Sequence, residues 1–155
     1  MGDGLAHSSN RTRRIRRSAI VERSAARLYA LVEDIESYPR FVPHCIAAHV
    51  HERSAARTVA TLVFGVPPLR ASLTTENVNS PGESIRMRLR EGPFRHFAAA
   101  WRFTPLGPEA ARVDFALEYE FANRLAEKTL GPLFERLADT IVEAFHARAL
   151  RDDPA

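Results

Sequence analysis

Apolar and polar residues alternate over most of the region between residues 45 and 121, which is the pattern of half-buried β-strands. Turn residues interrupt this alternation and divide the region into six strands, with breaks at 52–54, 65–68, 79–82, 91–93 and 106–109. The clearest alternation is the last one, formed by Val113, Phe115, Leu117, Tyr119 and Phe121. Strands that follow one another through such short turns predict an antiparallel sheet.

One more strand and two helices are predicted ahead of this region. Residues 13–21 form the strand, and Ser24 is a good N-cap for a helix with apolar positions at Leu28, Leu31, Val32 and Ile35. Pro39 and Pro43 prevent a long continuation, because proline has no amide hydrogen and holds the preceding residue in an extended conformation. We therefore expect a short second helix or turn between Ile35 and Pro43.

The periodicity becomes helical from Asn123 to Leu150. One stripe of this segment is apolar and consists of Leu130, Leu133, Phe134, Leu137, Ile141, Ala144 and Phe145. Gly131-Pro132 lies inside the pattern, so a kink, or a separate first turn with the main helix beginning at Pro132, is expected there.

The predicted order of elements is βααββββββα, which places the chain in the α+β class. A seven-stranded antiparallel sheet curved around the long C-terminal helix satisfies this order, because the sheet face and the helix stripe each need an apolar partner. We expect one domain over residues 13–150, with a disordered tail at 1–12 and a short C-terminal tail at 151–155.

Charged residues mark the outer face of the predicted sheet. Arg86, Arg88 and Arg90 alternate on one strand, while Asp114, Glu118 and Glu120 alternate two strands later. If the first and last strands pair, Arg14 and Arg16 face Glu118 and Glu120 and form ion pairs across the strands. These acids are therefore interpreted as ion-pair partners and not as catalytic carboxylates.

Composition is that of a globular domain, with 45% hydrophobic and 26% charged residues in a chain of 155. The single cysteine, Cys45, excludes a disulfide within the chain. No apolar run approaches the length of a membrane helix, and MGDGLAHSSN has no apolar segment of a secretory signal. A cytoplasmic protein, or one held peripherally at the inner membrane, is expected.

The net charge of +3 is concentrated near the N-terminus. Residues 1–27 carry a net charge of +5, so the rest of the chain carries −2. With Arg14 and Arg16 assigned to ion pairs, Arg11, Arg13 and Arg17 are left to contact a ribosome or an anionic membrane surface. This distribution does not predict a DNA-binding domain.

Several motifs together resemble one known family. They are Ser37-Tyr38-Pro39-Arg40-Phe41-Val42-Pro43-His44-Cys45, Gly92-Pro93-Phe94, Trp101-Arg102-Phe103-Thr104-Pro105, and Ala144-Phe145 followed by Arg148-Ala149. In this order and spacing they resemble the coenzyme-Q-binding and ribosome-association-toxin family of START-like proteins, within the polyketide cyclase/dehydrase and lipid-transport superfamily. The resemblance covers roughly residues 13–150. Ala98-Ala99-Ala100 departs from the glycine that relatives often carry before the tryptophan, and the Ala99 methyl group is expected to narrow the cavity.

The resemblance implies a helix-grip fold with a hydrophobic cavity between the sheet and the C-terminal helix. It implies a binder of ubiquinone or a related polyprenyl lipid that supports respiratory quinone function or lipid transport. A ribosome-association toxin that binds the large subunit and blocks subunit joining is the alternative, and a polyketide cyclase is the second. No cofactor is required for the leading function beyond a bound ubiquinone or lipid.

Inward-facing apolar residues supply the candidate ligand site, although the same residues would also make a filled core. The resemblance favours a hollow interior. The predicted ligand-binding residues are Tyr38, Phe41, Val42, Pro43, Phe64, Leu73, Leu89, Phe94, Phe97, Trp101, Phe115, Tyr119, Phe134, Leu137, Ile141 and Phe145. Leu62, Leu117 and Leu133 are predicted to face inward as well. Residues 38–43 and 92–94 are two apolar loops that would border an entrance or simply form turns.

Signals for catalysis and metal binding are weak. His44 and Cys45 point apart on an extended chain, which makes them a poor pair of base and nucleophile. Cys45, His49 and His51 share one strand face, but Ile46, Ala48 and Val50 form the apolar face of that strand, so no metal site is predicted. No phosphate-binding loop, nucleophile elbow or HExxH motif occurs. No catalytic residue is assigned, and a cyclase would depend on cavity shape with Tyr119 or Arg102.

Overall fold

The computed structural model describes residues 11–151. Most of the predicted disordered tail and most of the C-terminal tail lie outside these residues. Within the first predicted tail, the Thr12 hydroxyl donates a hydrogen bond of 3.1 Å to Glu120 Oε1. The elements in order are β1 (Arg13–Val21), α2 (Ala25–Glu33), η1 (Ile35–Arg40), β2 (Cys45–Arg53), β3 (Arg57–Val66), β4 (Leu69–Ser80), β5 (Ser84–Glu91), β6 (Phe94–Gly107), β7 (Ala110–Phe121) and α3 (Arg124–Arg151).

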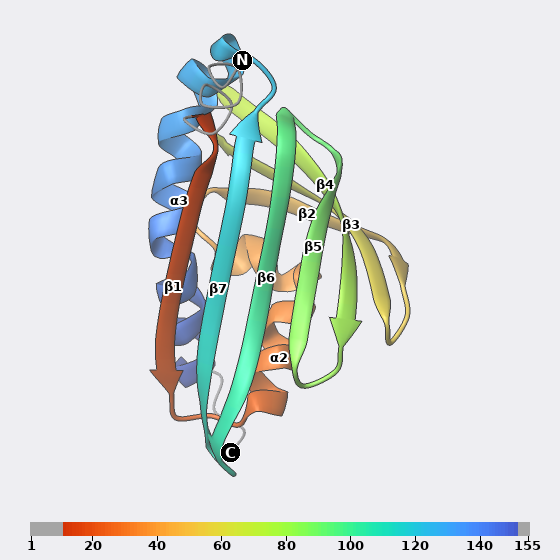
Figure 1. Ribbon diagram of the computed structural model, residues 1–155, viewed down its shortest axis with the longest axis vertical. Coiled ribbons are helices and arrows are strands. Elements are labelled where there is room, and N and C mark those ends of the chain that lie inside the picture. The colour runs from red at the N-terminus through yellow and green to blue at the C-terminus, as the bar shows by residue number, and fades with distance from the viewer. Residues whose placement is uncertain (1–10, 152–155) are drawn as a thin grey trace, which may run out of the picture.

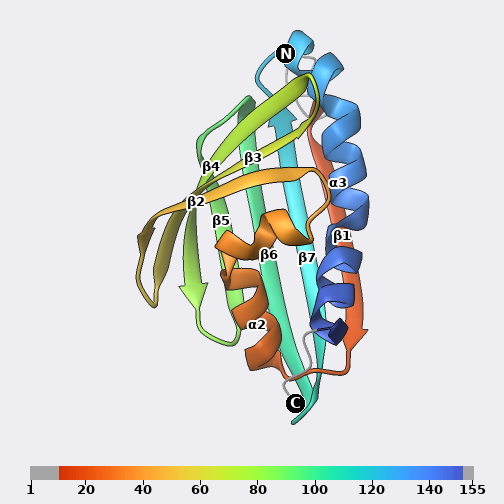
Figure 2. The same cartoon turned by 180° about the vertical axis from the view of Figure 1, so that it is seen from behind.

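A single seven-stranded antiparallel sheet forms the body of the protein, with the order β1-β7-β6-β5-β4-β3-β2. The first strand, β1, pairs with the last strand, β7, as predicted. This pairing and the position of α3 confirm the α+β helix-grip fold. Figure 1 looks onto the sheet face that carries no helix. Figure 2 shows the opposite face, where α2 and η1 lie in front of the strands and α3 runs alongside β1 and β7.

Local sequence explains where the helices begin and end. The Ser24 hydroxyl accepts a hydrogen bond of 3.2 Å from the Arg27 backbone N–H and caps α2, whose Ala25, Leu28 and Val32 are buried. The helix η1 is a short 3₁₀ helix that contains Pro39, in agreement with the predicted short second helix. The helix α3 runs without interruption through Pro132, so the predicted alternative of a separate first turn is wrong.

The core lies between the inner face of the sheet and α3. From residue 97 to 103 on β6 and from 111 to 121 on β7, every second residue faces this core. The register places Trp101 opposite Phe115 with ring centroids 4.6 Å apart. From the other side, α3 contributes Phe134 and Phe145, which are 2% and 4% exposed. The interior is therefore rich in aromatic side chains and is covered by α3 together with α2 and η1.

Strand β2 departs from the predicted alternation. A register shift between Cys45 and Ala47 breaks the period of two, so Cys45 is buried while Ile46 is 41% exposed. The prediction that Cys45 shares a strand face with His49 and His51, and that Ile46 belongs to the apolar face, is wrong for this reason. The two histidines are exposed, as predicted.

The β1/β7 register confirms one predicted ion pair and corrects the other. Arg14 lies opposite Glu118, and its Nε is 2.7 Å from Glu118 Oε2. Arg16 lies opposite Ala116 and not Glu120. Glu120 is buried, with Arg95 Nη1 3.5 Å from its Oε2. The prediction of an Arg16–Glu120 pair fails because β1 and β7 run antiparallel, so the residue two positions after Arg14 lies opposite the residue two positions before Glu118.

Candidate ligand-binding cavity

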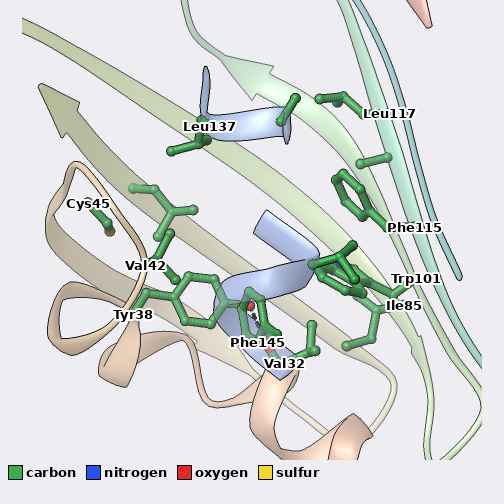
Figure 3. Packing of buried hydrophobic residues seen from close by; sticks show 14 of the residues in the cluster. Val32, Tyr38, Val42, Cys45, Ile85, Trp101, Phe115, Leu117, Leu137 and Phe145 are labelled. Atoms are coloured by element: carbon green, nitrogen blue, oxygen red, sulfur yellow. Dashed lines mark hydrogen bonds between the residues drawn. The ribbon is translucent and has the colours of Figure 1, made fainter. Parts of the chain in front are cut away.

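A small cavity of about 60 Å³ lies between the inner sheet face, η1 and α3. Figure 3 shows Tyr38 and Val42 on one side of this interior, Trp101, Phe115 and Leu117 from the sheet on another, and Leu137 and Phe145 from α3. Its full lining consists of Tyr38, Val42, Leu62, Phe64, Leu73, Met87, Phe97, Ala99, Trp101, Phe115, Leu117, Phe134, Leu137, Ala138, Ile141 and Phe145. Each of these side chains is apolar or aromatic.

Most predicted ligand-binding residues come together in this lining. Those that do so are Tyr38, Val42, Phe64, Leu73, Phe97, Trp101, Phe115, Phe134, Leu137, Ile141 and Phe145. Leu62 and Leu117 were predicted to face inward and also line it. Ala138 is a lining residue that the helical stripe omitted, although its spacing of four from Phe134 and seven from Phe145 would have identified it.

Five predicted residues lie elsewhere. Phe94 and Tyr119 are buried in an aromatic cluster that includes Phe134, with the Phe94 and Phe134 ring centroids 5.0 Å apart. Phe41 packs edge-on against Phe145, at 5.0 Å between ring centroids, outside the lining itself. Pro43 is exposed and Leu89 is half-buried, and neither contributes to the cavity.

The one hydroxyl among the lining side chains is already engaged. Tyr38 donates a hydrogen bond from its hydroxyl to the Val32 carbonyl oxygen, drawn as a dashed line in Figure 3. Burial raises the pKa of Tyr38 well above its usual range, so this hydroxyl stays protonated. Tyr38 therefore presents its ring to the cavity, and the arrangement can hold a ligand by burial and ring contacts.

The two residues named for a cyclase do not reach the cavity. Arg102 is exposed on the outer face of β6, and Tyr119 is buried in the aromatic cluster without lining the cavity. Burial raises the pKa of Tyr119 above its usual value. The lining thus carries no carboxylate, imidazole or free hydroxyl among the described residues.

Residues 35–44, which we call the η1 segment, close one side of the cavity. The Tyr38 and Phe145 ring centroids are 5.2 Å apart, and the Arg148 guanidinium lies over the Phe41 ring at 5.2 Å from its centroid. These contacts fasten the segment to the last turns of α3. A cation over an aromatic ring contributes on the order of 1 kcal/mol at an accessible site.

Arg53 of β2 fastens the same segment from the other side. Its Nε lies 2.9 Å from Glu33 Oε2 and its Nη1 lies 2.8 Å from Glu36 Oε2. The hydrogen bond from Arg53 lowers the pKa of Glu36 below its ordinary value. The η1 segment is therefore held by side-chain contacts at both ends, with the cavity beneath it.

The histidine and cysteine residues at the start of β2 form no metal site. Cys45 Sγ lies 3.7 Å from the Ala47 carbonyl oxygen, and burial raises the pKa of the thiol to about 11. His51 Nε2 lies 2.7 Å from Thr61 Oγ1 on the outer face. Within residues 11–151 there is no group of three or more His, Cys, Asp or Glu side chains that could hold a metal ion.

Two of the three arginines predicted to contact a partner have acidic neighbours on α3. Arg13 Nη2 lies 3.4 Å from Glu135 Oε2, and Arg17 Nη2 lies 2.6 Å from Asp139 Oδ1. These ion pairs connect β1 to α3 at the surface, so the two arginines have a structural role that the strand pattern did not predict. None of the helices in the described part of the chain is long and apolar enough to cross a membrane.

The antiparallel sheet wrapped around α3, with an apolar cavity between them, defines a START-like helix-grip protein. A family model described as "Polyketide cyclase / dehydrase and lipid transport" matches residues 21–146. The chain belongs to this family, as the sequence resemblance implied.

Relatives of the chain include ribosome association toxins and a coenzyme Q-binding protein. The protein named ribosome association toxin RatA from Escherichia coli strain K12 is 38% identical over 135 residues, which cover 87% of this chain and 85% of that protein. RatA of Pseudomonas aeruginosa is 41% identical over 87% of this chain and 94% of its own length. The mitochondrial coenzyme Q-binding protein COQ10 of Drosophila melanogaster is 28% identical over 76% of this chain and 50% of that protein.

Solved structures share the fold. The Zhui aromatase/cyclase from Streptomyces sp. R1128 superposes with a TM-score of 0.79 over 90% of this chain and 94% of that one, at 18% identity, a likeness that shows the fold alone. The 18 kDa protein CC1736 from Caulobacter crescentus superposes with a TM-score of 0.69 over 90% and 97% of the two chains, at 28% identity.

Proposed function

We propose that the protein binds an apolar small molecule, a polyprenyl quinone such as ubiquinone or a related polyprenyl lipid, between the sheet and α3 without catalysing a reaction. The observation that carries this proposal is the lining of the cavity, in which every side chain is apolar or aromatic. The name of the COQ10 relative supports the choice of a quinone. Support of respiratory quinone function or lipid transport would follow from such binding.

The physical basis of binding is removal of apolar surface from water, worth about 25 cal/mol for each Å² buried. A flat quinone ring would also stack on Trp101 and Phe115, which lie side by side at the cavity. Such aromatic pairs add about 1 kcal/mol beyond burial. Neither contribution requires a charged side chain.

The cavity must expand before it admits such a ligand. Its volume of about 60 Å³ is well below the roughly 150 Å³ of a cavity that holds benzene. Typical ligand pockets occupy about 300–1,000 Å³. Because the η1 segment is a short 3₁₀ helix held by side chains, its displacement from α3 is the simplest way to open the interior.

Titration with a short-chain ubiquinone tests the proposal, because the protein has one tryptophan and Trp101 lines the cavity. We expect the quinone to quench Trp101 fluorescence saturably. Ala99→Val adds two methyl groups inside the cavity and should weaken binding about tenfold or more, equivalent to about 1.4 kcal/mol. The matched control is Ala100→Val, which adds the same groups on the other face of the same strand and should bind as wild type.

Two results would contradict quinone binding. One is the absence of saturable quenching together with the absence of extractable quinone or lipid from the purified protein. The other is an equal effect of Ala99→Val and Ala100→Val, which would place the ligand outside the cavity.

A second candidate function is association with the ribosome. It is favoured by the two relatives named ribosome association toxins, which are 38–41% identical over 87% of this chain. If this function holds, overproduction of the protein should increase free ribosomal subunits at the expense of joined ribosomes in a sucrose gradient. Unchanged profiles at high expression would count against it.

A further inference from the structure

The outer face of the sheet carries a groove that the cavity function does not use. It has a volume of about 580 Å³ and lies across β1, β7, β6, β5 and β4, on the face turned toward the viewer in Figure 1. Ala98, Ala100 and Ala116 form its floor. Arginines form its walls, with Arg14 and Arg16 on β1 and Arg86 and Arg88 on β5.

The strand registers arrange these residues in two parallel rows. In the first row, Arg14 stands opposite Glu118 and Arg88 opposite Glu76, and both arginines are ion-paired, at 2.7 and 3.2 Å. This row is electrically balanced. The two arginines neutralise the two acids of this row. The net charge of the groove therefore depends on the second row.

The second row contains no acid. Arg16 lies opposite Ala116, Ala116 opposite Ala100, and Ala100 opposite Arg86. Neither Arg16 nor Arg86 has an ion-pair partner among residues 11–151, and both are exposed. Three strand spacings separate them, which corresponds to about 14 Å between backbones. Two unneutralised guanidinium groups therefore face each other across a floor of methyl groups.

A third arginine extends this positive region. Arg102 follows Ala100 by two residues on β6 and is exposed on the same face. The acid opposite it, Asp114, is 3.1 Å from Arg112 Nε and is neutralised by that residue. Arg102 itself has no ion pair within the described part of the chain. Three arginines without ion pairs among residues 11–151 are thus gathered on the outer face of the sheet.

We propose that this groove binds the phosphodiester backbone of a single RNA strand through Arg16 and Arg86, with Arg102 beside the groove on the same face. A planar guanidinium contacts two phosphate oxygens at once, which makes arginine well suited to phosphate. Short alanine side chains recess the floor between the arginines, so a narrow polyanion can lie between the walls. Positively charged grooves of this kind follow the backbone of single-stranded nucleic acid.

Other polyanions fit the groove less well. A flat anionic membrane would meet the protruding walls and leave the recessed floor without contact. The inference goes beyond the cavity function and deepens the ribosome candidate, on which the choice of RNA as the polyanion rests.

The direct test measures the fluorescence anisotropy of a labelled 12-nucleotide single-stranded RNA of mixed sequence. The double variant Arg16→Glu/Arg86→Glu should bind at least about tenfold more weakly than wild type at 50 mM salt. If both arginines contact phosphates, removing them should also reduce the slope of log affinity against log salt by about 1.4. The matched control Arg40→Glu/Arg70→Glu makes the same change of charge at exposed sites outside the groove and should lose less than about threefold.

Several outcomes would overturn the proposal. Equal losses of RNA affinity in the two double variants would show that only net charge matters. Absence of RNA binding by the wild-type protein would also overturn it. So would binding to phosphatidylglycerol vesicles, in place of RNA, that depends on Arg16 and Arg86. Sucrose gradients with the same variants separate this proposal from the ribosome candidate. If the groove variant still alters ribosome profiles as wild type does, the groove is not the docking surface although the ribosome function stands.

Discussion

Phe145 is the residue at which the parts of the cavity meet. Its ring centroid lies 5.2 Å from that of Tyr38, 5.0 Å from Phe41 and 5.1 Å from Trp101. It is 4% exposed and belongs to α3, so it joins the helix to both the sheet and the η1 segment. Because its ring contacts join three parts of the structure, its removal should affect stability strongly.

Phe145→Ala should lower the free energy of unfolding by about 3–5 kcal/mol, because it leaves a cavity that the surrounding rings cannot fill. Phe145→Leu retains most of the buried volume and should cost clearly less. Urea denaturation followed by circular dichroism measures both. A loss of less than about 1 kcal/mol for Phe145→Ala would mean that the η1 segment does not depend on this ring.

Cys45 is the second residue whose environment can be tested alone. Burial raises the pKa of its thiol to about 11, so at pH 8 the thiolate fraction is lower by about a hundredfold than for a thiol with an ordinary pKa. Native protein should therefore react with 5,5′-dithiobis(2-nitrobenzoic acid) at least about a hundred times more slowly than protein unfolded in urea. Equal rates would show that Cys45 is open to solvent.

At the scale of elements, Glu76 holds three strands together. From β4 it reaches Arg57 of β3, with Oε2 2.6 Å from Arg57 Nε, and both Arg88 and Arg90 of β5, at 3.2 Å each. These guanidinium groups, Arg57 first, lower the pKa of Glu76 to about 2. The carboxylate therefore stays ionised in the folded protein at pH values where it would be protonated in the unfolded chain.

Because the pKa of Glu76 is lower in the folded protein than in the unfolded chain, its carboxylate stabilises the folded state. This stabilisation is complete at pH values above the pKa of the unfolded chain and is lost as the pH falls through the pKa of the folded protein. Wild type should therefore exceed Glu76→Gln in Tm at pH 7, and the difference should shrink as the pH falls from about 5 to about 2. Thermal denaturation at a series of pH values measures it. Glu109→Gln, an exposed turn residue without an ion pair in the described part of the chain, is the control. A difference that does not vary with pH would disprove the role of the Glu76 carboxylate.

The order and bounds of the elements were predictable because alternation and helical spacing are properties of single segments. Residues 13–21 and the cap at Ser24 match the structure directly. The bulge after Cys45 and the position of Arg16 opposite Ala116 were not predictable, because both depend on how one strand is shifted against its neighbour. The inward-facing residues were predictable for the same reason as the strands, whereas the volume left between them depends on packing of all side chains together.

At the scale of the whole molecule, one sheet separates an apolar cavity from a charged groove. The segment Ala98-Ala99-Ala100 of β6 contributes to both, since Ala99 lines the cavity and its two neighbours form part of the groove floor. Period-two alternation sends successive side chains to opposite faces. Three small residues in succession therefore leave space on both faces of the sheet at the same position along β6.

Salt should affect binding at only one of the two faces. Burial of an uncharged quinone releases no counterions, so quenching of Trp101 should give the same affinity at 50 and 200 mM salt, while RNA binding by the groove should fall severalfold or more. Arg16→Glu/Arg86→Glu should weaken RNA binding and leave quinone binding unchanged, and Ala99→Val should do the reverse. Ala99 and part of the groove floor both belong to β6. If either variant loses both activities while circular dichroism shows an intact fold, the two faces are coupled through the sheet. Independent losses would show that β6 serves two sites whose chemistry differs only by which way a side chain points.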